Sequence, residues 1–317
     1  MPIDGIFNID KPTGMTSHDV VARIRRLAGQ KRVGHAGTLD PAASGVLPIL
    51  LGQATRVAEY LSESGKAYRA TICFGVVTDT YDADGQVVRE ASVALTRDDI
   101  ERALPEFLGE QLQRPPIYSA LKRDGQRLYA LARKGQDVAV EPRPVTITRL
   151  EIIDWTTPTL TLNVECGKGT YIRSLAYDLG ERLGPGAHLA ALIRTRSGPF
   201  TLSASVTLEM LAAAFADDSW RDYCFAPDEA LLDWQAAILD EANEARVRFG
   251  QTLRVQARDT MDFQPPERPL LPLLPLLPLL PLLRAYSADG RFLGILRREE
   301  SAYQPHKVFP SEPDEAD

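Results

Sequence analysis

Cysteine is scarce in this chain, with three residues in 317. Cys73, Cys166 and Cys224 are odd in number and widely spaced, so they predict neither a disulfide framework nor a paired-cysteine metal site. This usage is typical of a reducing compartment. The N-terminal stretch MPIDGIFNIDKPTG lacks the basic region and the apolar region of a signal peptide. We therefore expect a cytoplasmic protein.

Long apolar runs that could form a membrane helix are also missing. The most apolar segment, PLLPLLPLLPLLPLL at 269–283, is too short to span a bilayer, and its prolines remove the hydrogen bonds of a helix. Its period of three suits polyproline II. We interpret it as an expanded low-complexity loop, with a ligand-binding motif as the alternative. No membrane partner is expected.

The chain also lacks a positive net charge. The formal net charge is -7, from 36 Lys and Arg against 43 Asp and Glu. Phosphate contacts need cations, so this total argues against an RNA partner. The distribution matters more, because basic residues crowd 23–32 and 122–143, whereas 208–245 contains Arg221 as its one basic residue. Both nucleic-acid binding and an ordinary solvated surface remain open.

Strands and helices are predicted in an irregular order. Strands are expected at 6–9, 68–74, 145–155 and 159–166, a hairpin turn at 84–85, and helices at 16–29, 96–109 and 170–183. Two of the helices begin with capping-box patterns, Thr16 with Asp19 and Thr96 with Asp99. No regular βαβ rhythm appears, which favours the α+β class over a doubly wound sheet.

A second, smaller domain is predicted after the acidic stretch 216–232. Residues 245–255 and 283–296 have the pattern of strands, with Asp289-Gly290 as a hairpin turn. We therefore divide the chain into domains 1–232 and 233–317, and the PLL segment lies inside the second.

One glycine-punctuated segment carries a candidate catalytic carboxylate. It reads KRVGHAGTLDPAASGVLP, from Lys31 to Pro48, with Asp40 near its centre. Glycines permit close backbone approach or a positive φ, and the proline after Asp40 biases that residue away from the helical conformation. A lone aspartate in a loop is more often a turn former than a nucleophile, so the residues alone leave both interpretations open.

The stretch GHAGTLDPAASGVLP resembles the catalytic motif of the TruB family of tRNA pseudouridine synthases. Further motifs of that family occur in the family's order within 5–210: KPTGMTS at 11–17, KAYR at 66–69, GKGTYIRS at 167–174 and GAHL at 186–189. The resemblance implies the pseudouridine synthase fold in 1–232, with a mixed, largely antiparallel sheet and flanking helices. It also implies a small β-barrel similar to the RNA-binding PUA domain in 233–317.

The resemblance further assigns catalytic roles to Asp40, Tyr68 and Arg173. Pseudouridine formation breaks the N1–C1′ bond of uridine, turns the uracil and joins C5 to C1′. Asp40 would serve as the carboxylate against the ribose or the base, and Arg173 would lower its pKa. Tyr68 would stack on the flipped uracil and could accept the C5 proton. The reaction needs no redox change or external group, so neither a cofactor nor a metal is expected.

Four substrate-binding residues follow from the same resemblance. His35 would occupy the space that the flipped base vacates, and Tyr171 and Leu192 would line the pocket. Lys11 would support the catalytic loop or contact a phosphate. His35 also has a structural interpretation as a hydrogen-bonding histidine, and Tyr171 and Leu192 as core residues.

The segment at about 111–143, which contains RPPIYSALK, resembles the insertion by which this family clamps the tRNA T-loop. The guide-dependent relatives lack such an insertion. We therefore expect a stand-alone enzyme that acts on uridine 55, contacts the T-loop and acceptor arm of tRNA, and needs no protein partner. A tRNA folding chaperone without catalysis and a guide-dependent pseudouridine synthase remain as alternatives. A glycosidase is disfavoured, because it normally needs two carboxylates.

Overall fold

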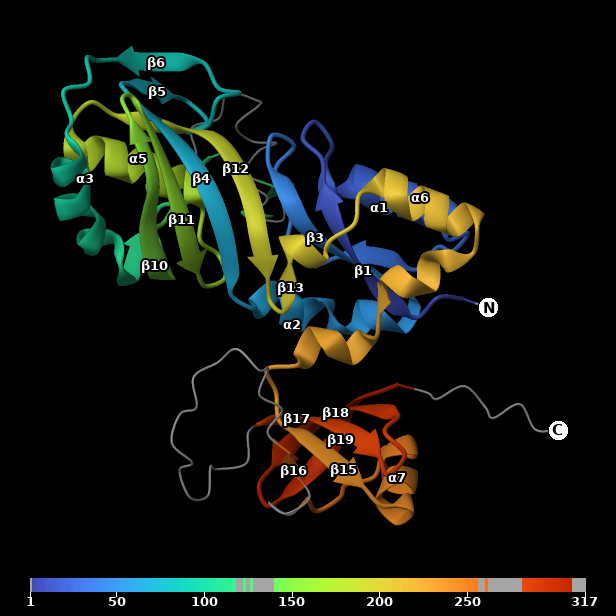
Figure 1. The fold of residues 1–317 in the computed structure, drawn as a ribbon. Helices are drawn as coiled ribbons and strands as arrows, with labels where there is room; N and C mark the ends of the chain where they lie inside the picture. The colour runs from blue at the N-terminus through green and yellow to red at the C-terminus, as the bar shows by residue number, and fades with distance from the viewer. Residues whose placement is uncertain are drawn as a thin grey trace.

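The computed structural model describes residues 2–117, 122–123, 126–127, 140–255, 260–261 and 281–309. A ten-stranded sheet forms the larger part of the described chain, with strand order β14-β1-β3-β12-β4-β11-β10-β7, β13 beside β12 and β2 beside β3 (Figure 1). The strands are β1 (Gly5–Lys11), β2 (Val33–His35), β3 (Ser44–Leu51), β4 (Lys66–Phe74), β7 (Gly109–Gln113), β10 (Arg143–Thr156), β11 (Thr159–Cys166), β12 (Ala187–Ser197), β13 (Phe200–Thr201) and β14 (Cys224–Phe225).

The sheet is mixed because β3 and β12 run parallel where they pair, at Ser44 with Ile193 and Gly45 with Arg194. The other described pairs of this sheet are antiparallel. Gly45 permits the close approach of these strands: its φ is +98°, and a Cβ there would lie 2.3 Å from the carbonyl oxygen of Arg194. The predicted α+β class with a largely antiparallel sheet is confirmed.

Helices cover one face of the sheet at its two ends (Figure 1). They are α1 (Ser17–Leu27) and α6 (Leu208–Ala216) beside β1, and α5 (Ile172–Leu183) against β12 and β4 with α3 (Arg97–Ala103) next to α5. Both predicted capping boxes are present, at the starts of α1 and α3. Apolar residues of all four helices, such as Ile24 and Leu175, share one hydrophobic cluster with the sheet. Burial of each such side chain stabilises the fold by roughly 1.5–3 kcal/mol.

The opposite face of β1 and β3 is covered as well. Ile6, Val46 and Leu50 pack against η1 (Gly52–Val57) and α2 (Ala58–Glu63), in a cluster that also includes Ile295 and Phe309 near the C-terminus. Because both faces are buried, β3 is an almost continuous apolar run rather than an alternating strand. This packing also fixes the start of β3, which directly follows the Asp40 loop.

A hairpin of β5 (Val76–Thr78) and β6 (Val87–Glu90) follows β4, as the Asp84-Gly85 signal predicts. Its connecting loop runs from 79 to 86 and includes Asp82. The loop returns to the main sheet, because Asp82 forms an isolated bridge with Leu189 of β12. The hairpin loop thereby places the carboxylate of Asp82 beside Arg173.

The C-terminal part forms a five-stranded sheet below α2 (Figure 1). Its order is β16 (Thr260–Met261), β15 (Ala236–Leu239), β17 (Leu282–Ser287), β18 (Phe292–Glu299) and β19 (Ala302–Val308). The predicted turn at 289–290 joins β17 to β18. A small β domain therefore fits, while its closure into a barrel and its PUA-like character stay predictions.

The predicted strand at 245–255 is wrong, because helix α7 occupies Glu241–Arg248. The Asp240 side chain accepts a hydrogen bond from the backbone of Asn243 and caps the helix. Acidic residues lie in the first turn and basic ones in the last, which suits the helix dipole. Gly250, with φ +67°, follows the helix end.

Within the described residues, no helix is long and apolar enough to cross a membrane. Residues 269–280 of the PLL segment and 118–121, 124–125 and 128–139 of the predicted insertion lie outside the described residues.

Candidate active site

The loop that carries Asp40 is held by the N-terminal motif KPTGMTS. Ser17, at the start of α1, donates its hydroxyl to the carbonyl of Leu39 and accepts from the amide of the same residue, at 3.1 and 2.9 Å. The amide of Gly14 donates to the carbonyl of Pro41 at 2.8 Å. Two motifs that are distant in sequence therefore fix the backbone on both sides of Asp40.

Lys11 lies beneath this loop. Its side chain is fully buried, and its ammonium group donates to the carbonyls of Pro12, Met15 and Pro41 at 2.8, 2.7 and 3.4 Å. Burial is the main cause that lowers the pKa of Lys11 to about 8. Of the two predicted roles, this geometry supports the loop contact and not the phosphate contact.

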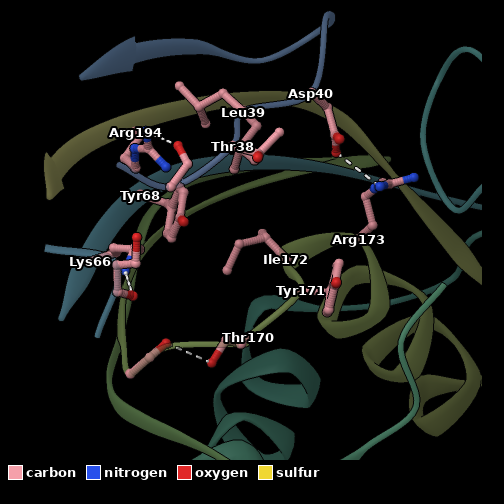
Figure 2. A pocket seen from close by; sticks show the side chains of 15 residues that line it. Thr38, Leu39, Asp40, Lys66, Tyr68, Thr170, Tyr171, Ile172, Arg173 and Arg194 are labelled. Carbon is pink, nitrogen blue, oxygen red and sulfur yellow. Dashed lines mark hydrogen bonds and ion pairs between the residues drawn. The ribbon is translucent and has the colours of Figure 1, made fainter. Parts of the chain in front are cut away.

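Arg173 links two carboxylates at the edge of the site. It is the second residue of α5, its side chain is 7% exposed, and its guanidinium lies 3.0 Å from Asp40 and 3.2 Å from Asp82. The carbonyl of Thr80 accepts a further hydrogen bond at 3.4 Å. A charged group this deeply buried needs such partners to offset its desolvation. The arginine is thereby fixed in one orientation toward Asp40 (Figure 2).

The pKa of Asp40 is raised above its usual value, which corrects the prediction from sequence. Protein surrounding the carboxyl group disfavours its charged form, and this burial outweighs the opposing effect of Arg173. The charge of Asp82 acts in the same direction as burial. The side chain nevertheless opens on the cavity, since 47% of it is exposed. The predicted ion pair is present, but it limits the rise instead of producing a net fall.

A cavity of about 270 Å³ lies next to Asp40. Sequence-predicted residues contribute Asp40, Tyr68, Tyr171, Arg173 and Leu192 to its lining. The remaining lining residues are Gly37, Thr38, Leu39, Ser62, Lys66, Gly167, Gly169, Thr170, Ile172 and Arg194. Ligand pockets for drug-sized molecules have volumes of roughly 300–1,000 Å³. This smaller cavity suits a ligand the size of one nucleoside.

Tyr68 and Arg194 form a buried pair on neighbouring strands. They are register partners of β4 and β12, and Arg194 donates hydrogen bonds to the carbonyls of Val46 at 2.7 Å and Gly37 at 2.9 Å. The charge of Arg194 also acts on the hydroxyl group of Tyr68. Burial raises the pKa of Tyr68, and the arginine opposes that rise. The tyrosine is therefore neutral and held with its ring at the cavity (Figure 2).

Tyr171 and Leu192 reach the cavity from two different elements. Tyr171 is the N-cap residue of α5, and its backbone exchanges two hydrogen bonds with the side chain of Gln113, at 2.8 and 3.0 Å. Leu192 lies on β12, opposite Ala70 of β4. Both residues line the cavity, so the site is assembled from the Asp40 loop, α2, β4, the start of α5 and β12.

His35 lies on β2, outside the lining of the cavity. Its ring meets the ring of His18 edge-on, with 5.4 Å between centroids. Burial is the main cause that lowers the pKa of His35 to about 4, with His18 as a second cause. The imidazole is therefore neutral near pH 7. Its role beside a flipped base stays a prediction.

Two site residues, Asp82 and Arg194, are not singled out by the sequence patterns, and Lys66 belongs to the KAYR motif but received no role from it. Asp82 belongs to the acidic turn DTYDADG, where an aspartate is already explained by turn formation. Arg194 lies within a strand whose basic residues suggest a solvent-facing side, yet it is 1% exposed. The one available signal is the alternation of β12, which places Leu192 and Arg194 on the same face.

Among the described residues, no group of three or more His, Cys, Asp or Glu is arranged to hold a metal ion. The chemical groups of the site are one carboxylate open to a cavity, a buried guanidinium that orients it, and a tyrosine ring. This set can present a negative charge to a small planar ligand and stack on its face.

Comparison with family models gives two matches. Residues 25–172 match the model described as TruB family pseudouridylate synthase, N-terminal domain. Residues 173–233 match the model described as tRNA pseudouridylate synthase B C-terminal domain. Together the two matches run across the Asp40 loop, β4 and α5.

Curated relatives are similar over most of their length. A protein of Dehalococcoides mccartyi named tRNA pseudouridine synthase B is 42% identical over 98% of this chain and 97% of its own. A protein of Symbiobacterium thermophilum with the same name is 56% identical over 78% of this chain and 82% of its own.

Solved structures with a similar fold include chains of two larger complexes. A chain in a Cbf5-Nop10-Gar1 complex superposes with a TM-score of 0.70 at 27% identity, over 93% of this chain and 78% of that one. A chain in an H/ACA ribonucleoprotein bound to a substrate RNA containing 2′-deoxyuridine gives 0.71 at 25% identity, over 97% and 85%.

Proposed function

The chain belongs to the TruB family of pseudouridine synthases, and we propose that it converts uridine 55 in the T-loop of tRNA with Asp40 as the reacting carboxylate. It is a tRNA pseudouridine synthase, an isomerase. The target position, the use of the T-loop and the roles of individual residues are the substance of this proposal.

The observation that carries the proposal is the ion pair of Asp40 with Arg173 at the edge of a cavity that Tyr68 also lines. Asp40 reacts with the ribose side of the nucleoside, either at C1′ or through the C2′ proton. Arg173 favours the charged form of this carboxyl group and aims it at the cavity. Asp82 holds the arginine from the other side. The acid is therefore oriented before the substrate arrives, and Arg173 opposes the rise in its pKa that burial causes.

Tyr68 acts on the base. Its ring lies beside the cavity, next to Arg194 on the neighbouring strand. Stacking on such a ring returns about 1–3 kcal/mol per base. This gain offsets part of the cost of flipping the uridine out of the RNA. To accept the C5 proton after C5 has joined C1′, the Tyr68 hydroxyl group must first give up its own proton, a loss that Arg194 favours and burial opposes.

We assign the catalytic domain to 1–232, with an RNA-clamping insertion at about 111–143, and a PUA-like domain to 233–317 that contacts the acceptor arm. The two parts are connected by residues near α2: Lys307 donates to the carbonyl of Arg56 at 2.6 Å and pairs with Glu59. The enzyme works in the cytoplasm without an obligatory protein partner.

Two alternatives are less favoured. The guide-dependent enzyme corresponds to structures at 25–27% identity, whereas relatives named for tRNA are 42–56% identical. A tRNA folding chaperone without catalysis does not need a carboxylate open to a cavity and paired with a buried arginine. Folding activity and catalysis do not exclude each other, because one protein can have both.

The test is tritium release from tRNA transcript that contains 5-tritiated uridine, with purified protein and no added cofactor. We expect stoichiometric release, and mapping of the product places pseudouridine at position 55. Tight tRNA binding without release would favour the chaperone or a missing guide. Release from another position would contradict the assigned target.

A further inference from the structure

Lys66 lies in the cavity but has no part in the mechanism above. It is the first residue of β4, two positions before Tyr68, and is 8% exposed. Its ammonium group donates to the carbonyls of Ser62 at 2.9 Å and Ser64 at 2.8 Å. A lysine has three N–H donors. Two are used by these carbonyls within the described chain, and the third is available to a ligand in the cavity.

The position of Lys66 is opposite to that of the reacting carboxylate. Figure 2 shows Asp40 and Arg173 on one side of the pocket and Lys66 with Arg194 on the other, with Tyr68 nearer to the second pair. A nucleoside whose ribose meets Asp40 and whose base stacks on Tyr68 therefore directs the far edge of that base toward Lys66. This far edge is the part of the ring opposite the glycosidic bond.

Lys66 keeps a positive charge at neutral pH. Burial and the charge of Arg194 lower its pKa to about 8, while Cys166 and Glu63 oppose this change. Glu63 is itself paired with Lys168 on the surface. A cation in a confined site interacts with a negative ligand atom more strongly than it does in water. The third donor of Lys66 thus suits an acceptor that gains negative charge.

On the basis of the proposed function, we propose that Lys66 is a substrate-binding residue that donates a hydrogen bond to the uracil carbonyl oxygen opposite the glycosidic bond. Before bond cleavage this atom is O4. The contact both recognises the base and stabilises the charge that the base acquires.

Cleavage of the glycosidic bond explains why the base acquires a negative charge. When the N1–C1′ bond breaks, the bonding electron pair stays with the uracil, which becomes an anion delocalised over N1, O2 and O4. C1′ then either forms a bond to Asp40 or, after loss of the C2′ proton, a double bond to C2′. C5 bonds to C1′ as the bond to Asp40 breaks or as the proton returns to C2′, after which C5 loses its proton and N1 gains one. A donor on O4 lowers the energy of the anion throughout its lifetime.

The same donor also serves the rotated base. A half-turn of uracil about the axis through N3 and C6 exchanges N1 with C5 and O2 with O4. When C5 faces C1′, the atom opposite the new bond is therefore O2. Lys66 meets a carbonyl oxygen in both orientations without moving. A fixed lysine thus suits an isomerase whose substrate and product differ by this rotation.

The test combines a protein change with a change of one substrate atom. A thiocarbonyl sulfur accepts hydrogen bonds more weakly than oxygen does, so tRNA with 4-thiouridine at the target weakens the proposed contact. Single-turnover conversion of the uridine and 4-thiouridine substrates is measured by nucleoside chromatography, for the wild type and for Lys66→Met. The uridine-to-thiouridine rate ratio is then compared between the two proteins. Any effect of sulfur on the reaction itself is common to both and cancels in this comparison.

We expect Lys66→Met to convert uridine roughly 10- to 100-fold more slowly, because a charged hydrogen bond is lost. The uridine-to-thiouridine rate ratio should be about 10-fold lower in Lys66→Met than in the wild type. Equal ratios, within about twofold, would overturn the proposal. Wild-type activity on uridine is the separate check on the function itself, so the two failures are distinguishable.

Lys168→Met is the matched control, because its lysine is 62% exposed and pairs with Glu63 close to the same site. It should keep the wild-type ratio. Thermal melting and tRNA binding establish that each variant is folded. If Lys66→Met does not fold, Lys66→Gln replaces it, and its rate ratio should be at least about threefold below that of the wild type. An unchanged ratio for Lys66→Gln would equally overturn the proposal.

Discussion

Arg173 and Asp40 form an ion pair across 3.0 Å in which the arginine is nearly buried and the aspartate opens on a cavity. Burial raises the pKa of Asp40, and Arg173 is the strongest influence that opposes this rise. The arginine therefore controls how much of the carboxyl group is ionised as well as where it lies. The first two predictions concern this control.

Replacing Arg173 with Met removes the main group that lowers the pKa of Asp40. The pKa should rise further, so the rate should be lost at a higher pH as the solution is acidified. At neutral pH we expect the single-turnover rate to fall by about 100-fold or more, as for loss of a group that stabilises and orients charge. Rate measurements across pH provide the check. An acidic limb that stays at the wild-type pH would contradict this account.

Asp82→Asn tests the positioning of Arg173. The substitution removes one of its two carboxylate partners but leaves Asp40 in place. We expect the rate constant of the bound complex to fall about 10- to 100-fold, because the arginine loses a charged hydrogen bond that fixes its orientation. Filter binding should show tRNA affinity within about threefold of the wild type. A loss confined to affinity would show that Asp82 acts on RNA binding instead.

Tyr68→Phe separates stacking from proton transfer. Phenylalanine keeps the ring that stacks on the base but loses the hydroxyl group. We expect the affinity for tRNA to change little and tritium release to slow by about 100-fold, within the usual range for acid–base groups. Tyr68→Ala is the companion variant and should weaken binding as well. If Phe restores full release, the hydroxyl group is not the acceptor of the C5 proton.

The PLL segment at 269–283, which we interpret from sequence as an expanded loop, ends in a residue that belongs to the core. Leu283 lies in β17 and is fully buried. Deletion of 269–280 should barely change activity on full-length tRNA. Deletion of 269–283 should destabilise the C-terminal sheet, since loss of one buried leucine costs about 2–5 kcal/mol. Thermal unfolding compares the two variants, and a large loss of activity for the shorter deletion would make the segment functional.

The sequence predicts best where one local rule decides the outcome. The capping boxes at Thr16 and Thr96 set the starts of α1 and α3, and both are present. Period-two alternation identifies β4 and β11. The family resemblance points to Asp40, Tyr68, Tyr171, Arg173 and Leu192, and these residues line one cavity.

Features that depend on distant contacts are predicted less well. Asp82 and Arg194 gain their roles from partners on other elements, which no local pattern encodes. The pKa of Asp40 depends on a balance between burial and the charge of Arg173. The sequence predicts the arginine partner but not the extent of burial. Helix α7 was mistaken for a strand because its Asp240 cap and its charged termini outweigh a short run of strand-like residues.

The central claim is that Asp40 performs the chemistry and is not needed for binding. Asp40→Asn keeps the shape of the side chain and removes its charge. Single-turnover tritium release and tRNA affinity should be measured together on this variant and the wild type. We predict no detectable release, with affinity within about one order of magnitude of the wild type. An affinity loss as large as the loss of activity, or release that continues, would contradict the role assigned to Asp40.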